Sequence, residues 1–178
     1  MATQIVLLRG INLGSRNRIA MPELRDLLTS AGFEDVRTYL QSGNVVLSGK
    51  GPADEVAREC ERQIAAHFGL DIPVVARTRA QLARVVRLNP LAKVAVDPKR
   101  YQVSFISGRL TAEVVRKLEA AAAPSEEFVV AGKEVYAWHP GSVARSKLWT
   151  LLAGRGLGVT ATARNWTTVT SLLALAED

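Results

Sequence analysis

The chain has 178 residues, 48% of them hydrophobic and 22% charged, and its 23 Lys and Arg against 17 Asp and Glu give a net charge of +6. This composition excludes a disordered or fibrous protein, and a chain of this length buries enough surface to fold without a metal or a disulfide. The single cysteine excludes a disulfide framework, no apolar run is long enough to span a bilayer, and the first residues lack the pattern of a signal peptide. We therefore expect a cytoplasmic protein that does not enter a membrane.

Residues 1–77 predict one βαββαβ unit, which is the ferredoxin-like arrangement. Pro22 suits the first turn of a helix, and the apolar residues from Leu24 to Ala31 recur at helical spacing. Gln41-Ser42-Gly43-Asn44 is a tight turn between two short apolar runs. The strand, helix, strand, strand, helix and strand are expected at residues 5–9, 22–31, 36–40, 45–48, 54–68 and 72–76.

Residues 78–98 predict a linking helix and loop between two subdomains. Thr78 and Gln81 have the spacing of a capping box, which opens a helix that continues to Leu88. Asn89-Pro90 ends that helix, and Asp97-Pro98-Lys99 marks a turn. The domain boundary is therefore placed here.

Residues 99–178 repeat the pattern and add a closing helix. A Gly-x-Gly-x-Gly segment at 154–158 precedes a strand instead of following one, so it predicts a turn and not a dinucleotide site. The predicted fold class is α+β, with two ferredoxin-like βαββαβ units in tandem, a linking helix and a C-terminal helix. The elements of the second unit are expected at 102–106, 111–122, 128–131, 134–138, 146–153, 158–163 and 167–175.

A first candidate site follows from the predicted topology. A right-handed crossover makes the first two strands of such a unit parallel, so the end of the first strand meets the turn after the second. Residues 1–22 contain no acid, and a glycine loop beside a helix N-terminus suits an anion. Arg16 and Arg18 add positive charge to this loop. The ligand-binding residues expected at this edge of the sheet are Arg9, Gly10, Asn12, Gly14, Ser42 and Asn44.

A second candidate site lies in the second unit, where residues 135–176 also lack acids and hold the basic residues Arg145, Lys147, Arg155 and Arg164. The ends of the strands that reach Trp138-His139 and Arg164-Asn165-Trp166 are expected to lie together. Arg145, Lys147, Arg164, Asn165 and Trp166 would then form a basic group beside an indole on which a base could stack. The alternative is that Trp166 fills the core and that Asn165 or Thr167 caps a helix.

Other chemistry has little support in the residues. With only His67 and His139, a typical zinc set is unavailable. Carboxylates could still bind magnesium, but no acidic cluster indicates such a site, so no metal and no cofactor is expected. Cys60 lies on the apolar stripe of its helix, where an inert buried thiol is expected. A phosphate-binding Walker loop is absent from the sequence. No catalytic residue can therefore be assigned, and whether the protein is an enzyme stays open.

Several short motifs together resemble the domain-of-unknown-function 1697 family of bacterial proteins. They are the opening Leu8-Arg9-Gly10-Ile11-Asn12-Leu13-Gly14 segment, Met21, Leu24, Gly32-Phe33, Thr38-Tyr39, Ser42-Gly43-Asn44, Asn89-Pro90 and Thr162-Ala163-Arg164-Asn165-Trp166. The resemblance runs over nearly the whole chain and implies a two-part α+β fold with ferredoxin-like character. It implies no particular reaction. The positions that it singles out are Arg9, Gly10, Asn12, Gly14, Ser42, Asn44, Arg164, Asn165 and Trp166.

Three functional hypotheses follow. The leading one is a protein that binds a phosphate-bearing ligand, either a nucleotide or a nucleic acid, at the basic loop clusters. The second is an enzyme acting on a small anionic substrate in a cleft between the subdomains, with Ser42 or Tyr39 as candidate participants. The third is a non-catalytic protein-interaction module in which the same polar residues only form turns and caps. The oligomeric state is not predicted.

Overall fold

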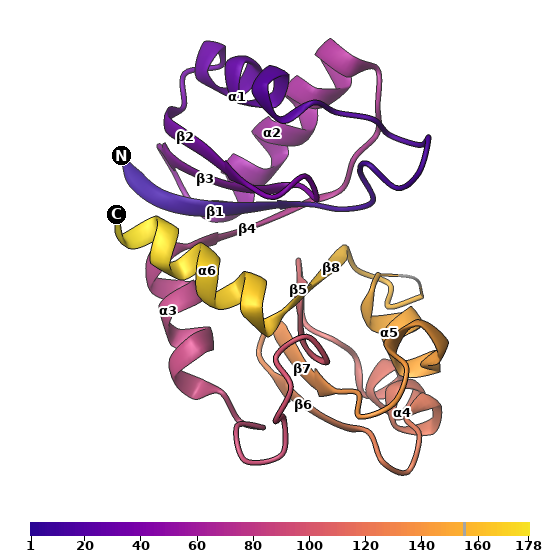
Figure 1. The fold of residues 1–178 in the computed structure, drawn as a ribbon. Coiled ribbons are helices and arrows are strands. Elements are labelled where there is room, and N and C mark those ends of the chain that lie inside the picture. Colours follow the sequence, from indigo (N-terminus) through magenta and orange to yellow (C-terminus); the bar gives the residue numbers. More distant parts are fainter. Residues whose placement is uncertain (155) are drawn as a thin grey trace. The chain divides into compact units, whose positions relative to one another are not determined.

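Two four-stranded antiparallel sheets and their helices make up the computed structural model, which describes residues 1–154 and 156–178 (Figure 1). The expected fold class, α+β with tandem ferredoxin-like units, is confirmed. The contacts divide the chain into unit 1, residues 1–83 with 172–178, and unit 2, residues 84–171. Arg155, one of the basic residues considered above and part of the turn expected at 154–158, lies outside the described residues. Within the described residues, no helix has the length and apolar character needed to cross a membrane.

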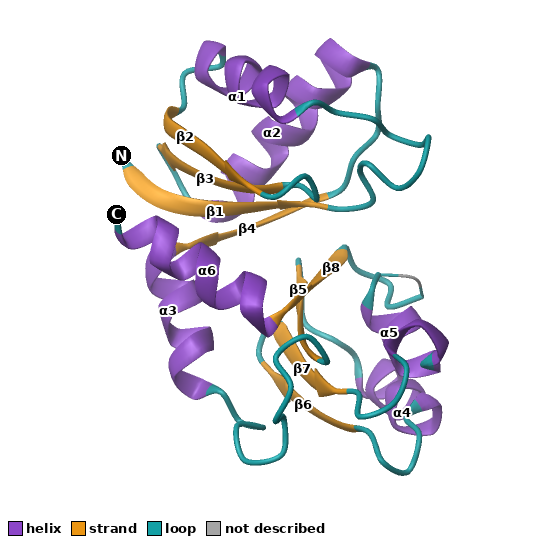
Figure 2. Cartoon of the chain, viewed as in Figure 1, coloured by secondary structure: helices purple, strands orange, loops and turns teal. Residues whose placement is uncertain are grey.

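In unit 1 the sheet has the strand order β2-β3-β1-β4, and helices α1 and α2 cover one of its faces (Figure 2). Leu24 and Leu28 from α1 and Cys60 and Ile64 from α2 join the inward residues of the strands in one core. Helix α2 ends at Gly69, which adopts the left-handed conformation. The elements are β1 (Ala2–Leu8), α1 (Met21–Ser30), β2 (Glu34–Tyr39), β3 (Asn44–Gly49), α2 (Ala53–Phe68) and β4 (Val74–Thr78).

Strand β2 contains a bulge that the sequence did not predict. Glu34 pairs with Ser48 and Arg37 pairs with Val46, so two residues of β2 lie opposite the single residue between them on β3. One of the two, Asp35, has a left-handed backbone with φ +49°. Because side chains alternate along a strand, the extra residue brings Arg37 to the face that Ser48 occupies.

In unit 2 the sheet has the order β6-β7-β5-β8, which is the same arrangement as in unit 1. The capping box predicted at Thr78 and Gln81 is present at the start of α3, since each backbone N–H donates to the other residue's side chain. The remaining elements are α3 (Arg79–Leu88), β5 (Tyr101–Ile106), α4 (Ala112–Ala121), β6 (Glu127–Ala131), β7 (Glu134–Trp138), the short 3-10 turn η1 (Val143–Arg145), α5 (Lys147–Leu152), β8 (Ala161–Asn165) and α6 (Trp166–Glu177).

Two strand predictions were displaced by two or three residues. The strand expected at 72–76 begins at Val74, because Pro73 has no N–H to donate to a ladder. The strand expected at 158–163 runs instead over Ala161–Asn165. Gly158 has φ +72°, which is incompatible with a strand, and Asn165 pairs with Gln102. Arg164 and Asn165 are therefore inside a strand and not beyond its end.

The turn between β2 and β3 depends on a glycine. Gly43 has φ +85°, and a Cβ added to it would lie 2.7 Å from the Cβ of Leu8. We expect Gly43→Ala to lower the free energy of unfolding by about 2–4 kcal/mol, since backbone strain and a steric clash act together. Gly14→Ala is the matched control, because Gly14 has φ +60° with nothing within 4 Å, and should cost about 1 kcal/mol.

The measurement is urea denaturation followed by far-UV circular dichroism. Tryptophan fluorescence is unsuitable for unit 1, because Trp138, Trp149 and Trp166 all belong to unit 2. Equal losses of stability in the two variants would show that the contact with Leu8 carries no cost.

Candidate functional site

The structure brings the first group of expected site residues to one edge of the unit 1 sheet. The backbone N–H of Leu8, at the end of β1, donates to the carbonyl of Gly43 over 2.8 Å. The loop after β1 therefore begins beside the β2–β3 turn, as the topology predicted. Arg9, Gly10, Asn12, Gly14, Ser42 and Asn44 all lie in this loop, in this turn or at the start of β3.

The two asparagines of this group hold the loop and the turn together. Asn12 donates from Nδ2 to the carbonyls of Ile19, at 2.9 Å, and Gln41, at 2.8 Å, while its Oδ1 accepts from the N–H of Ile19 at 2.8 Å. Asn44 is fully buried, and its Nδ2 donates to the carbonyl of Tyr39 and to Ser42 Oγ. These amides make internal hydrogen bonds, which is the role that the interaction-module hypothesis assigns to them.

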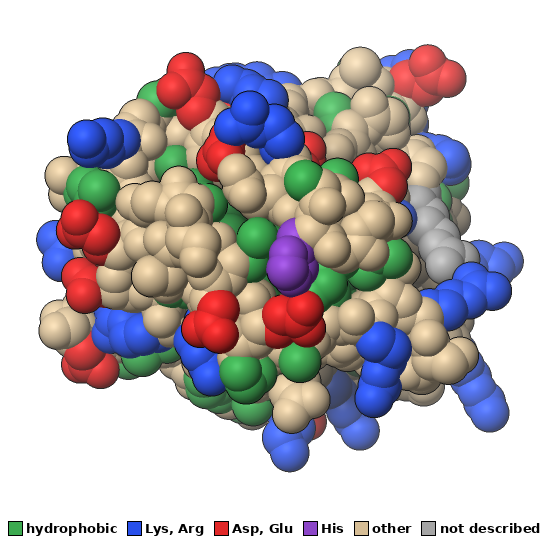
Figure 3. Space-filling model, turned by 90° about the horizontal axis from the view of Figure 1, so that it is seen from above, with side chains coloured by type: hydrophobic (Ala, Val, Ile, Leu, Met, Phe, Trp, Pro, Cys, Tyr) green, Lys and Arg blue, Asp and Glu red, His purple; other side chains and the backbone are tan. Residues whose placement is uncertain are grey.

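Two arginines of the loop, unlike its asparagines, are open to solvent. Arg16 and Arg18 are exposed and Arg9 is half-buried. Arg18 donates to the carbonyl of Gly14 over 2.8 Å, which braces the tip of the loop. The segment between β1 and α1 projects beyond the ends of the strands (Figure 1). By contrast, acidic and basic side chains are interspersed when the molecule is viewed from the side of α1 and α2 (Figure 3). The loop thus carries three arginines and no acidic residue.

In the second group, Trp166 and Asn165 make contacts within unit 2. The indole of Trp166 stacks on the ring of Tyr101, with centroids 4.8 Å apart and planes inclined by 25°. Asn165 Oδ1 accepts from the N–H of Thr168 over 2.9 Å, so this residue caps α6. One face of the indole is therefore covered by the protein's own aromatic ring.

The basic residues of the second group do not form one cluster. Arg164 pairs with Val103, so it lies on the sheet face opposite Ile106 and Ala161. Helix α5 packs against the face that holds Ile106 and Ala161, through Leu148 and Leu152. Arg164 and α5 therefore lie on opposite faces of the sheet. Arg164 was expected just beyond the end of its strand, but it lies within β8, where successive side chains alternate between the two faces of the sheet. Arg145, in η1, and Lys147, the first residue of α5, are both exposed.

Arg164 is held by its own strand. Its guanidinium donates to Thr162 Oγ1 at 2.7 Å and to the carbonyl of Ala163 at 2.9 Å. Burial lowers the pKa of Arg164 to about 10, so the side chain keeps its positive charge at neutral pH.

Unit 2 contains a buried polar cluster that the sequence did not predict. Glu126 Oε2 lies 2.5 Å from His139 Nδ1 and accepts from Ser146 Oγ at 2.6 Å. Ser146 also caps α5 by accepting from the N–H of Trp149. His139 is buried, and the opposite ring atom, Nε2, has no hydrogen-bond partner among the described residues. Ser146 carried a signal as a helix cap, but no local pattern pointed to Glu126.

This cluster ties three separate segments together and does not resemble a catalytic triad. In a triad the carboxylate and the hydroxyl bond to opposite nitrogens of the imidazole. Here the Ser146 hydroxyl bonds to the carboxylate of Glu126 and lies 3.4 Å from the same Nδ1 atom. The arrangement is therefore suited to stabilising unit 2 and not to activating a nucleophile.

The thiol of Cys60, the single cysteine of the sequence, is inert. It is fully buried in the core of unit 1. Burial raises its pKa to about 12, so the thiolate is not formed at neutral pH. No group of three or more potential metal ligands occurs among the described residues.

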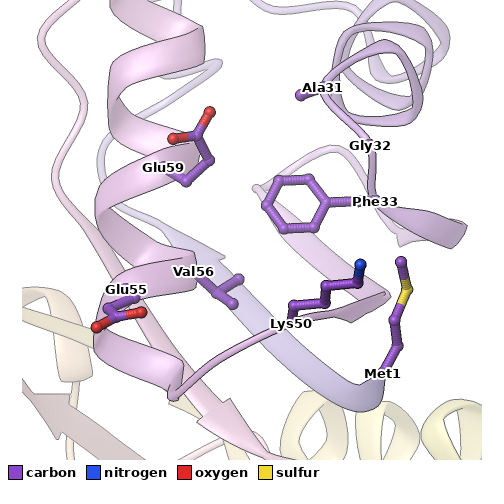
Figure 4. Close-up of a pocket in the computed structure, with 8 residues that line it drawn as sticks. All are labelled: Met1, Ala31, Gly32, Phe33, Lys50, Glu55, Val56 and Glu59. Carbon is purple, nitrogen blue, oxygen red and sulfur yellow. The ribbon is translucent and has the colours of Figure 1, made fainter.

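Two cavities offer little to a phosphate. The first, of 370 Å³, lies in unit 1 with the Phe33 ring between Glu59 and Lys50 (Figure 4). The Lys50 ammonium shares this cavity with two carboxylates, because Glu55 lines it as well as Glu59. The second, of 560 Å³ in unit 2, is lined by apolar residues and three glutamates, Glu119, Glu126 and Glu127. Negative charge in both cavities disfavours a phosphate ligand.

Comparisons with known proteins bear on the fold. The family model described as "Protein of unknown function (DUF1697)" matches residues 1–136, so the Thr162–Trp166 motif lies outside the matched part. The structure of the conserved bacterial protein SP0830 from Streptococcus pneumoniae is similar, with a TM-score of 0.80 and 21% identity over 98% of each chain. No curated protein gives a significant match. The likeness to the solved structure shows a shared fold.

The Glu126 cluster predicts a pH dependence of stability. Burial, the largest influence, opposes ionisation of Glu126, but hydrogen bonds from Ser146, the Ala123 N–H and His139 together lower its pKa below the ordinary value of 4.5. A lowered pKa in the folded state stabilises the protein above that ordinary value, and the contribution is lost as the pH falls through and below it. We expect Glu126→Gln to cost about 1–3 kcal/mol at pH 7 and to flatten the decline of stability below pH 5.

Urea denaturation followed by tryptophan fluorescence at several pH values measures this effect, because all three tryptophans lie in unit 2. Glu127→Gln is the control, since Glu127 is the exposed neighbour. An acid decline of the same steepness in Glu126→Gln and in the unmodified protein would contradict the prediction.

Proposed function

This chain belongs to the DUF1697 family of proteins of unknown function, and we propose that it binds single-stranded nucleic acid through the basic loop of unit 1. The basic loop is defined as residues 9–18. The observation that carries the proposal is that this loop holds three arginines and no acid and is braced internally by its own side chains.

Bracing matters because it lowers the cost of binding. A mobile loop would lose conformational freedom when its arginines engaged phosphates, whereas a preorganised loop loses little. Asn12 links the loop to the β2–β3 turn, and Asn17 donates to the carbonyl of Gly10 over 3.0 Å. Arg9, Arg16 and Arg18 are thus presented on a defined backbone.

An extended polyanion fits this surface better than a single nucleotide. Arg16 and Arg18 are exposed on a projecting loop and do not line the cavities of units 1 and 2 described above. Leu13, at the same tip, is 66% exposed, and Leu40 of the neighbouring turn is 58% exposed. Apolar groups interleaved with cations are suited to a strand whose unstacked bases alternate with phosphates.

The test measures binding of a fluorescently labelled single-stranded RNA by anisotropy at 25–200 mM KCl. The unmodified protein should bind more weakly as salt rises, because each neutralised phosphate releases counterions. Replacing Arg16 and Arg18 together by alanine removes two such contacts. The slope of log K against log salt should then become shallower by about 1.4.

Replacing Arg58 and Arg62 by alanine provides the matched control. These exposed arginines lie on α2 of the same unit, so the change in net charge is identical. Binding of the control variant should keep the unmodified slope. Equal slopes in the loop variant and the unmodified protein, or no binding at 25 mM KCl, would rule out the proposed surface. A loss confined to the Arg145→Ala/Lys147→Ala variant would transfer the site to unit 2.

A further inference from the structure

A third cavity, of 510 Å³, lies wholly within unit 1 and differs from the other two in its charges. Its lining comes from β1, β2 and β3, from the first residue of α3 and from the last residues of the chain. Two arginines, Arg37 and Arg79, line it together with the acidic residues Asp35, Glu177 and Asp178. The volume falls in the range of small-molecule sites, about 300–1,000 Å³.

The less exposed part of this cavity presents hydrogen-bond donors. Thr3 and Ser48 are direct partners on the neighbouring strands β1 and β3, and Arg37 lies two positions along, opposite Val46. All three donors are half-buried. Two hydroxyls and a guanidinium on one sheet face are suited to a carboxylate, which accepts several hydrogen bonds at once.

One of these donors has no partner within the described part of the protein. Arg37 Nε is buried and makes no hydrogen bond. A buried donor without an acceptor is destabilising, and such groups in native proteins call for an explanation. An anion bound in the cavity would supply the missing acceptor.

The backbone of β2 beside Arg37 is also distorted. The bulge of β2 turns Arg37 toward Ser48, and it is formed with Asp35 in the left-handed conformation. Bulges are frequent beside functional sites, where they redirect a side chain. The strained residue itself lines the cavity, so one local distortion places both the cation and a carboxylate there.

The exposed edge of the cavity carries the negative charge. Asp35, Glu177 and Asp178 are exposed, as is Arg79. A phosphate dianion would meet three like charges at this edge. A molecule that carries a carboxylate at one end and an ammonium at the other satisfies both parts of the cavity.

We infer that this cavity binds a small zwitterion of the amino acid or dipeptide class. Its carboxylate accepts from Arg37, Thr3 and Ser48, and its ammonium group lies toward the acidic edge formed with Asp35. This site is separate from the basic loop, and the inference does not depend on nucleic-acid binding.

The experiment is a calorimetric titration of the full chain with L-lysine, glycylglycine, succinate and inorganic phosphate. The zwitterions should bind, succinate should bind at least about tenfold more weakly for lack of an ammonium, and phosphate should not bind. Arg37→Gln should weaken the zwitterions about tenfold or more, as expected for loss of a charged hydrogen bond.

The Asp35→Asn variant tests recognition of the ammonium group alone, because it removes one carboxylate and leaves Arg37 in place. The fold should tolerate it, since asparagine also adopts the left-handed conformation. The substitution should weaken glycylglycine several-fold and leave succinate no weaker. Arg58→Gln, on exposed helical surface, is the control for a lost cation and should change nothing.

Failure of both zwitterions to bind would overturn the inference, as would Arg37→Gln and Asp35→Asn variants that fold and bind as the unmodified protein does. Succinate or phosphate binding as well as glycylglycine would show a simple anion site and would overturn the zwitterion assignment. If Arg37→Gln does not fold, the Asp35→Asn variant decides the matter by the same titrations.

Discussion

The first strand of each unit pairs with two antiparallel neighbours, and in unit 1 this constraint decides where the loop after that strand begins. Strand β1 bonds to β3 on one side and to β4 on the other, and β5 does the same with β7 and β8. Antiparallel pairing brings the end of β1 to the start of β3, so that Leu8 meets Gly43 across 2.8 Å. The basic loop begins at the next residue, so pairing between β1 and β3 fixes where the loop leaves the sheet.

Polar side chains of similar composition serve different purposes according to the hydrogen bonds that they make. Asn12, Asn44 and Asn165 satisfy backbone groups of the protein, so their amides define turns and a helix start. Arg164 is likewise held by the strand in which it lies. Arg16, in contrast, is exposed on a braced loop, and Arg37 retains a buried N–H that has no partner among the residues that the structure describes. Residues such as Arg16 and Arg37 can therefore donate hydrogen bonds to a ligand.

Unit 2 is stabilised by a buried polar cluster that no local sequence pattern predicts. The carboxylate of Glu126 accepts from Ser146 and lies against His139, so residues from three separate segments share one buried charge. Such a group is favourable only while every partner is present, because a buried charge without compensation is costly. The Trp149 ring packs edge-on at 6.0 Å from the imidazole and helps to keep water away.

The sequence by itself determined the order of the elements, the ferredoxin-like topology and the meeting of the basic loop with the β2–β3 turn. These follow from hydrophobic periodicity and from turn and cap residues such as Gly43 and Thr78, which act over a few positions. It misplaced Arg164 by treating a strand as ending too early, because strand limits depend on pairing with distant residues such as Val103. Only the tertiary structure decided the bulge that turns Arg37 toward Ser48 and the joining of Glu126 with His139. A bulge is set by the register between two strands, and a buried cluster by the packing of separate segments, so neither leaves a local pattern in the chain.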